Sequence, residues 1–349
     1  MSPKQQEASP NAEGDLGPYD CVRDVEKVFT FSANSASDSS PENVIAFKFG
    51  GSSLLGAERM LHSAGLVRDT ALNLPVCVVV SAMKGVTDQL LAVAQLLSKN
   101  ESQKARRKAE EVVALHLATL QDLKVPEEDH DRVAEDLKLL SRDLLHETPA
   151  RGRVEVNNEL FDRLASFGER YSARLFAAAL GKIGVQAVPV VSSDFVLTCD
   201  NFRDAKPHLE HTRCRGRKVL LPLLEAGIVP VVTGFIGATP DGRITTLGRN
   251  SSDFSGALIA HVVDAEELVI WTDVDGIYTS NPHASAEARL LHELSYDEAR
   301  ALATSGARVL HPNVLPLAAQ TELTVWVRNT FKPHARGTRI GSQLDGGMA

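Results

Sequence analysis

Apolar runs of strand length alternate along the chain with longer segments of helical length. Strands are predicted for the Val-rich runs bounded by glycine, proline or polar residues, at 44–49, 76–82, 185–191, 228–233, 267–271 and 323–327. Helices are predicted between them, over 58–71, 88–97, 158–180, 218–226, 252–263 and 297–305. Continuously apolar strands separated by helices are typical of a largely parallel sheet that helices cover on both faces.

The segment 101–147 has a different pattern. It is rich in charge, and its apolar residues recur at helical spacing, as at Val112, Leu115 and Leu120. Pro126 interrupts the pattern, and a proline inside a helix removes a hydrogen bond and clashes with the preceding turn. Two helices packed as a hairpin are therefore predicted here.

The first 43 residues differ from the rest in composition. They hold three basic and eight acidic residues in a background rich in Ser, Pro, Glu and Asn. Such a segment buries too little apolar surface to offset the entropy of ordering. A disordered acidic tail is therefore predicted for 1–43, and a second, short tail for 344–349. The acidic composition disfavours an organelle transit peptide, and no apolar stretch at the N-terminus resembles a secretory signal.

Composition and charge narrow the class of protein. Of the 349 residues, 43% are hydrophobic and 23% are charged, which is ordinary for a globular protein. The 37 basic and 45 acidic residues give a net charge of -8, which argues against nucleic acid as the main partner. No apolar run reaches the roughly 18 residues that span a membrane. The four cysteines form no CxxC pair, so the reducing cytoplasm is expected, or a plastid if the source is a photosynthetic eukaryote.

The first candidate for chemistry is the segment KFGGSS, which starts at Lys48 and directly follows a predicted strand. Gly50 and Gly51 let the backbone approach an anion closely, and the helix that follows points free N–H groups at the same place. Lys48 adds a positive charge, while Ser52 and Ser53 add hydroxyl donors. A polyphosphate site is predicted, with an ordinary strand-to-helix turn as the alternative. The Walker A and dinucleotide-binding glycine patterns are absent.

A second polar segment, Ser81–Asp88, also lies at the end of a predicted strand and enters a helix. Ligands of open parallel sheets bind beyond the carboxyl ends of the strands. Two such segments at one edge of the sheet therefore predict a shared site. The alternative is that Thr87 or Asp88 only caps the following helix.

A third candidate is Glu169, which lies inside a predicted helix on a face of small and apolar residues. A carboxylate on such a face is costly unless a cationic group meets it. The preceding Gly168 weakens the helix unless another segment approaches closely there. Glu169 is therefore predicted to bind a cationic group, with a salt bridge to Arg170 or Arg174 as the alternative.

The segment TTLGRNSSD at 245–253 brings hydroxyls, a guanidinium and an acid to the start of a predicted helix. Arg249 suits the bidentate recognition of a carboxylate or phosphate. Asp253 is predicted to hold Mg²⁺ or to orient Lys48. An ordinary helix N-cap would explain Ser252 and Asp253, but it leaves Arg249 without a role.

Two further segments give weaker signals. WTDVDGIY at 271–278 ends a strand in a polar turn with an aromatic ring, which suits a purine and ribose but also fits a plain Asp-Gly turn. His208, His211 and Cys214 have a spacing that zinc could use. Their neighbours are cationic, so a solvated surface segment is the favoured interpretation.

Together these segments resemble the aspartate kinases of the amino-acid kinase family, over about residues 44–340. The resemblance rests on KFGGSS, SFGER, GFIG, TTLGRNSSD, WTDVDGIYTSNP and GARVLHP. Within the family, the GRNSSD and TDVDG forms resemble most the kinase domains fused to homoserine dehydrogenase. The resemblance implies a three-layer α/β/α sandwich with two lobes inside a catalytic domain at 44–343. The aspartate-binding lobe would span 44–235, and the nucleotide-binding lobe would span 236–343.

The resemblance also implies a role for each matching residue. Lys48 and Asp253 would be catalytic, and the phosphoryl group would be bound by Gly50, Gly51, Ser52 and Ser81. The aspartate pocket would comprise Thr87, Glu169, Phe235, Thr246, Arg249 and Ser252. The nucleotide would contact Thr272, Asp273, Tyr278, Pro282 and Arg308.

The reaction implied is the phosphorylation of the L-aspartate side chain by ATP, with Mg²⁺ carried mainly by ATP, at the start of the aspartate-derived pathway to lysine, threonine and methionine. Arg308 replaces the family's common lysine, and His283 replaces an arginine, so the nucleotide site departs from the pattern. The family's paired regulatory domains are expected to be absent. A built-in feedback site for lysine or threonine is therefore expected to be absent as well. A homodimer or a separate regulatory subunit is compatible with the sequence. The alternatives are a kinase for another amino-acid carboxylate and a catalytically weakened binding subunit.

Overall fold

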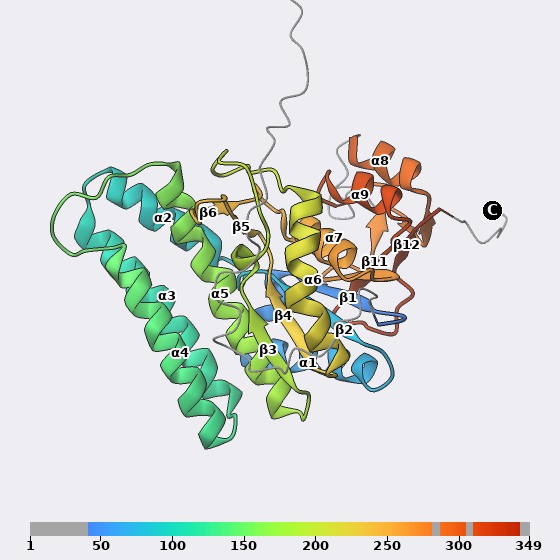
Figure 1. Cartoon of the computed structure of the whole chain (residues 1–349), viewed down its shortest axis with the longest axis horizontal. Coiled ribbons are helices and arrows are strands. Elements are labelled where there is room, and N and C mark those ends of the chain that lie inside the picture. Colours follow the sequence, from blue (N-terminus) through green and yellow to red (C-terminus); the bar gives the residue numbers. More distant parts are fainter. Residues whose placement is uncertain (1–40, 281–286, 305–309, 343–349) are drawn as a thin grey trace, which may run out of the picture. The chain divides into compact units, whose positions relative to one another are not determined.

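A computed structural model describes residues 41–280, 287–304 and 310–342, and in it an eight-stranded sheet carries the fold (Figure 1). The strand order is β10-β12-β11-β7-β1-β2-β4-β3. The strands are β1 (Ile45–Phe49), β2 (Val76–Val80), β3 (Ala187–Val190), β4 (Val229–Thr233), β7 (Glu267–Thr272), β10 (Glu293–Leu294), β11 (Thr324–Asn329) and β12 (Thr338–Ile340). The six predicted strands are all present, and only β11 and β12 pair antiparallel within this sheet as described.

Helices cover both faces of the sheet, which confirms the predicted three-layer α/β/α architecture. One layer contains α1 (Gly56–Ala71), α2 (Val86–Ser98), α3 (Ser102–Leu123), α4 (Glu127–His146) and α5 (Asn158–Lys182). The other contains α6 (Leu209–Glu225), α7 (Ser252–Val262), α8 (Tyr296–Thr304) and α9 (Val314–Gln320). The two-residue period of a strand explains this double burial. Phe47 and Phe49 face the first layer, whereas Ala46 faces the second.

The predicted helical hairpin is confirmed. α3 ends at Leu123 and α4 begins at Glu127, so Pro126 lies between the helices and precedes the first helical residue of α4. Lys124 adopts a left-handed conformation with φ of 50°, which ends α3 and turns the chain. The hairpin packs against α5, which places α5 between the hairpin and the sheet.

Three parts of the fold differ from the prediction. α6 begins at Leu209 instead of residue 218 and continues through Pro222. α9 and the short strands β5 (Ile236–Ala238), β6 (Ile244–Thr246), β8 (Ile277–Tyr278) and β9 (Leu290–Leu291) are not predicted by the pattern, nor are β10 and β12. These strands have two or three residues each, too few for an alternating pattern to be recognised. The first half of α6 is rich in charge and presents few apolar positions to reveal a helical period.

The predicted tails fall mainly on residues 1–40 and 343–349, which lie outside the described residues. Within the described residues, none of the helices combines the length and apolar character needed to cross a bilayer.

A buried histidine links α3 to α5. The His116 ring stacks on Tyr171 at 4.2 Å, and its Nδ1 lies 2.6 Å from the carbonyl oxygen of Val112. Burial lowers the pKa of His116 from 6.5 to about 4. The folded state therefore keeps this ring neutral in a pH range where the unfolded chain takes up a proton.

The consequence is a loss of stability on acidification. Because the folded pKa is depressed, the contribution of His116 is complete above pH 6.5 and is lost as the pH falls towards 4. We expect the wild type to lose about 2 kcal/mol more than His116→Leu between pH 7.5 and pH 5. Urea denaturation of both proteins at the two pH values measures this difference, and equal losses would contradict it.

Candidate functional site

The loops after the parallel strands β1, β2, β4 and β7 meet at one edge of the sheet. Ser81 N–H donates to Phe49 O at 3.1 Å, and Gly50 N–H donates to Trp271 O at 3.1 Å, so three strand ends are tied together. A side chain at Gly51 would place its Cβ 2.6 Å from the carbonyl oxygen of Ala82. Only glycine allows these two loops to approach so closely. The predicted shared edge is therefore present.

Lys48 and Asp253 form an ion pair at the centre of this edge. Lys48 Nζ lies 2.5 Å from Asp253 Oδ1, and the two side chains are 10% and 20% exposed. Lys48 reaches the site along α7, where Gly256 leaves room for its stem: a Cβ there would lie 3.2 Å from Lys48 Cβ. Asp253 lies in the first turn of α7, so the pair sits beside a helix N-terminus.

Two adjoining cavities open at this edge. The first has a volume of about 560 Å³ and is lined by Lys48, Gly50, Gly51, Ser81, Arg249, Asn250, Ser252, Asp253, Thr272, Leu310, His311 and Pro312. The second has a volume of about 350 Å³ and is lined by Gly51, Ser52, Ser81, Ala82, Met83, Lys84, Gly85, Thr87, Asp88, Leu91, Glu169, Phe235, Arg249, Asn250, Ser252 and Asp273. Because the cavities share five lining residues, they form one cleft with two compartments.

Glu169 closes the inner end of the second cavity. Its side chain is buried, its Oε1 accepts a hydrogen bond from Ala82 N–H at 3.0 Å, and its Oε2 is buried without a protein partner. Burial raises the pKa of Glu169 from 4.5 to about 8, although the Ala82 N–H and the charge of Lys48 oppose this rise. The alternative of a salt bridge to Glu169 is not supported, because Arg170 stacks on the Phe167 ring and Arg174 donates to the carbonyl oxygen of Arg170 at 3.0 Å. A buried carboxylate with one unpaired oxygen, in a residue that lines the cavity, suits a cationic ligand group.

Gly168 provides the close contact that the sequence suggests. A Cβ at Gly168 would lie 2.6 Å from Ala82 Cβ and 3.3 Å from Val86 Cγ1. Alanine favours a helix over glycine by up to about 1 kcal/mol, but overpacking costs about 1–3 kcal/mol. We therefore expect Gly168→Ala to lower the free energy of unfolding by about 1–2 kcal/mol, as measured by urea denaturation.

A second glycine of α5 provides the matched control for this prediction. Gly181 has no neighbouring atom within 4 Å of its ideal Cβ position, so Gly181→Ala meets no steric resistance. That variant should be neutral or slightly more stable than the wild type. If Gly168→Ala is equally stable, α5 does not pack against Ala82 as described.

The hairpin of β5 and β6 packs against α5 and follows Phe235, which is part of the wall of the second cavity. Phe235 precedes it in a left-handed conformation with φ of 69°, and its N–H donates to Ser255 Oγ at 2.7 Å. Thr246 ends the hairpin, and its hydroxyl donates to Asp162 Oδ1 at 2.7 Å. Thr246 therefore supports the wall and does not line either cavity.

The structure brings most of the predicted site residues together. The residues of the predicted set that line the cleft are Lys48, Gly50, Gly51, Ser52, Ser81, Thr87, Glu169, Phe235, Arg249, Ser252, Asp253, Thr272 and Asp273. Ser53 is buried and its hydroxyl pairs with Thr330 at 2.6 Å, so it does not face the cleft. Tyr278 pairs with β9 away from both linings. Pro282 and Arg308 lie outside the described residues.

The helix-cap alternatives are not supported. Gly85 occupies the N-cap of α2 and Ser251 that of α7, and neither cap has a side-chain hydrogen bond. Thr87 and Ser252 therefore have hydroxyls available to the cleft, where Ser252 Oγ lies 3.2 Å from Ser81 Oγ.

Several lining residues are not found by sequence reasoning. Asn250 lines both compartments and has a left-handed φ of 62°, while His311 lines the first. The histidine ring lies 5.9 Å from Phe254. Asn250 lies inside the motif 245–253 and His311 inside the motif GARVLHP, so both motifs could have indicated them.

Metal binding by side chains alone finds little support. Across residues 41–280, 287–304 and 310–342, no group of three or more His, Cys, Asp or Glu side chains is placed to hold an ion. His208 and His211 lie near the start of α6 with their rings 6.2 Å apart, and Cys214 is exposed.

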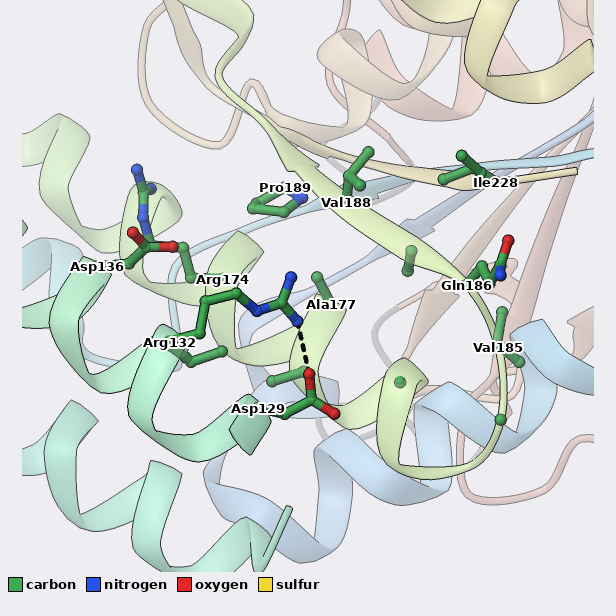
Figure 2. Close-up of a pocket in the computed structure, with 15 residues that line it drawn as sticks. Asp129, Arg132, Asp136, Arg174, Ala177, Val185, Gln186, Val188, Pro189 and Ile228 are labelled. Atoms are coloured by element: carbon green, nitrogen blue, oxygen red, sulfur yellow. Dashed lines mark hydrogen bonds and ion pairs between the residues drawn. The ribbon is translucent and has the colours of Figure 1, made fainter. Parts of the chain in front are cut away.

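Another cavity lies far from the predicted site residues, between α4, the end of α5 and the edge strand β3 (Figure 2). It has a volume of about 510 Å³. Its charged residues are on the α4 side, where Arg132 pairs with Asp129 at 2.8 Å, and Val188 and Pro189 form the opposite side. It lacks the adjacent glycines of the cleft, and the first turn of α4 presents the acidic Asp129 to it, which disfavours phosphate.

The cleft is suited to hold two anionic reactants side by side. Its first compartment offers the Lys48 ammonium group, the Gly51 N–H group and the start of α7. The second compartment offers the Glu169 carboxylate, and Arg249 lines both compartments. This is the complement of a phosphate-bearing molecule next to a small zwitterion.

Comparison with known proteins agrees with this geometry. A family model described as the amino acid kinase family matches residues 43–329. Lysine-sensitive aspartokinase 3 of Escherichia coli (strain K12) is 35% identical over 305 residues, which cover 86% of this chain and 65% of that protein. Aspartokinase 3, chloroplastic, of Arabidopsis thaliana is 33% identical over 308 residues, which cover 85% of this chain and 53% of that protein.

A solved structure has the same architecture. The crystal structure of E. coli aspartokinase III in complex with aspartate and ADP, in its R-state, superposes with a TM-score of 0.74 at 32% identity. The superposition covers 87% of this chain and 66% of that one. The chain thus spans between half and two thirds of the length of these relatives.

Proposed function

The chain belongs to the amino acid kinase family, and on that premise we propose that it transfers the γ-phosphoryl group of ATP to the side-chain carboxylate of L-aspartate. The products would be ADP and 4-phospho-L-aspartate. The observation that carries this proposal is the two-compartment cleft, in which Lys48 and Asp253 line one compartment and Glu169 lines the other. The aspartate- and ADP-bound aspartokinase III structure supports the choice of substrates.

The first compartment would receive the phosphate end of ATP. Gly51 would offer its backbone N–H group, and Gly50, whose own N–H donates to Trp271 O, would let the backbone approach the phosphate closely. Ser81, and Ser52 from the adjoining compartment, would add hydroxyl donors around the transferring group. Lys48 would interact with the charge on the phosphoryl oxygens, and Asp253 would hold Lys48 in place through their 2.5 Å contact. Preorganised positive charge of this kind is a principal source of rate enhancement in phosphoryl transfer.

The second compartment would bind the amino-acid head of aspartate. Glu169 Oε2 would accept the ammonium group, and Arg249 would bind the α-carboxylate. Thr87, Phe235 and Ser252 would complete the pocket, with Thr246 behind its wall. Fixing both charged groups leaves only the side-chain carboxylate free to reach the phosphate, which raises its effective concentration at the reacting atom.

The phosphoryl transfer would need no general base and no covalent intermediate with the protein. A carboxylate is already ionised and nucleophilic at neutral pH, so no general base is required. The barrier is the repulsion between two anions, which the cationic and N–H-lined first compartment would reduce. Mg²⁺ bound to the ATP phosphates would neutralise further charge. The side chains fit an ion carried by the nucleotide, because Asp253 is already paired with Lys48 and the described residues hold no three-ligand cluster.

The remaining nucleotide contacts are proposed from the family resemblance. Thr272 ends β7 and lines the first compartment, and the next residue, Asp273, lines the second. Both are proposed to contact the nucleotide. Tyr278, Pro282 and Arg308 are proposed to complete that site. We also propose that the domain divides into an aspartate-binding lobe and a nucleotide-binding lobe. A homodimer, or a complex with a separate regulatory subunit, is likewise part of this proposal.

An ADP-release assay with hydroxylamine tests the function directly. With ATP, Mg²⁺ and L-aspartate, the protein should release ADP and form aspartyl hydroxamate in equal amounts. D-aspartate, L-glutamate and a reaction without amino acid serve as controls. Turnover of L-glutamate in preference to L-aspartate would reassign the substrate, and ADP release without hydroxamate would contradict carboxylate transfer.

A further inference from the structure

Helix α5 carries a second buried carboxylate, which the proposed chemistry does not use. Asp162 lies seven residues before Glu169, and seven residues of an α-helix correspond to about 700°, close to two full turns. The two carboxylates therefore project from the same face of one helix. Both are buried, at 2% exposure each. A buried carboxylate is costly, so a position of this kind needs strong partners.

Asp162 has three such partners, and all of them come from distant parts of the chain. Its Oδ2 accepts hydrogen bonds from the N–H groups of Arg203 at 2.8 Å and Thr246 at 2.9 Å. Its Oδ1 accepts one from the Thr246 hydroxyl at 2.7 Å. Burial raises the pKa of Asp162, and these three donors oppose the rise. The carboxylate thus joins α5 to the end of β6 and to the loop before α6.

The contacts of Thr246 extend this junction towards the cleft. Its carbonyl oxygen accepts a hydrogen bond from Ala205 N–H at 2.9 Å, and the next residue, Leu247, donates to Phe235 O at 2.9 Å. Arg249 follows only three residues after Thr246. The intervening Gly248 has a φ of 92° and lies against Asp204, where a Cβ would be 2.9 Å from its Oδ1. The path of the chain into Arg249 is therefore fixed from Asp162.

We infer that Asp162 is a positioning residue for the amino-acid substrate: through Thr246 it sets where Arg249 lies relative to Glu169. This inference rests on the proposed function. α5 carries Glu169 directly and holds the Arg249 segment through Asp162, so one rigid helix sets the separation between the group for the ammonium and the group for the α-carboxylate. Asp162 itself lines neither cavity, and Lys48 and Asp253 of the first compartment are held by each other.

Asp162→Asn tests the inference with little change of shape. The amide has one acceptor oxygen and no charge. With that oxygen on the two backbone N–H groups, its NH2 group faces the Thr246 hydroxyl, which can no longer donate to this side chain, so the charge-assisted hydrogen bonds are lost. We expect the KM for aspartate to rise by about tenfold or more, with kcat and the KM for ATP changed by less than about twofold. A merely structural role would lower the active fraction and leave both KM values unchanged.

Two further variants keep the test decisive. Thr246→Val removes the hydroxyl from the same contact, so its effect on the aspartate KM should not add to that of Asp162→Asn in the double variant. Asp241→Asn makes the same chemical change on the exposed turn of the neighbouring hairpin, where Asp241 contacts Thr239 and Arg243, and should leave both KM values unaltered. Additive effects, or equal increases in both KM values, would overturn the inference.

Hydrogen–deuterium exchange separates this inference from the proposed function. Asp162→Asn should speed exchange in 244–250 and leave 81–88 unchanged, whatever the substrate is. If the wild type forms no aspartyl hydroxamate but this exchange effect is seen, the proposed function fails while the positioning by Asp162 stands. If neither the exchange nor the aspartate KM responds, Asp162 does not position the Arg249 segment.

Discussion

Lys48→Ala should lower kcat by about 100-fold or more, the scale expected for the loss of one preorganised charge. The Lys48 side chain is only 10% exposed and already held by Asp253, so no reorganisation is needed when phosphate arrives. Because Lys48 would act mainly on the charge of the transferring group, the KM for aspartate should change little. Steady-state kinetics by ADP release, with each substrate varied, measures both effects.

The Lys48 experiment needs controls for folding and for lysine loss in general. Lys48→Met keeps the length of the side chain beside Gly256 without the charge, so it should show the same loss of kcat. Lys138→Ala removes a lysine that pairs with Glu135 on the surface of α4, and it should behave as the wild type. If Lys48→Ala retains near wild-type turnover in a folded protein, Lys48 has no part in the transfer.

Glu169→Gln should raise the KM for aspartate by about 10- to 100-fold, since hydrogen bonds to charged groups are worth about 1.5–3 kcal/mol. Glutamine keeps an acceptor for Ala82 N–H but presents no charge to the substrate ammonium group. kcat should fall much less than the KM rises. An unchanged aspartate KM would show that Glu169 does not bind the ammonium group.

The same residue should make aspartate binding depend on pH. The pKa of Glu169 is about 8 in the ligand-free protein, so below pH 8 the carboxyl group is mostly protonated and must lose its proton to bind an ammonium group. The KM for aspartate should therefore fall by roughly tenfold or more between pH 6.5 and 8.5. Glu169→Gln should abolish this fall, and an equally steep fall in both proteins would assign it to another group.

Folding stability should respond to Glu169 in the opposite direction. Since the folded pKa lies above the ordinary value of 4.5, the folded state binds more protons than the unfolded state between pH 4.5 and 8, and stability falls as pH rises through this range. Bound aspartate would remove this cost by pairing the charge, with release of a proton near neutral pH.

The sequence predicts those helices and strands whose pattern of apolar residues can be recognised within a short stretch of chain. A Val-rich strand such as β2 is continuously apolar because helices cover both faces of the sheet, and that pattern is recognisable within five residues. The hairpin of α3 and α4 is equally clear, because Pro126 marks its turn. The first turns of α6 are not predicted, since their charged residues face solvent and only a few of them are buried.

The residues of the candidate site also divide into those that a local motif reveals and those that only distant partners explain. Lys48, Glu169 and Arg249 lie in motifs whose chemistry is unusual for their local structure, so each can be identified from its neighbours along the chain. Asp162 cannot, because its partners Arg203 and Thr246 lie 41 and 84 residues away. A carboxylate with only distant partners looks in the sequence like any polar residue in the first turns of a helix.

The shared face of Asp162 and Glu169 also restricts how the length of the chain can vary. One residue inserted between them would rotate one carboxylate by about 100° relative to the other and turn it away from its partners. Seven inserted residues would restore the direction but separate the carboxylates by about 10 Å more. Related kinases should therefore tolerate gaps in the α3–α4 connection at Lys124–Pro126, but keep the count from Asp162 to Glu169 constant. An alignment of their chains in which that count varies freely would show that α5 does not set the separation of the two carboxylates.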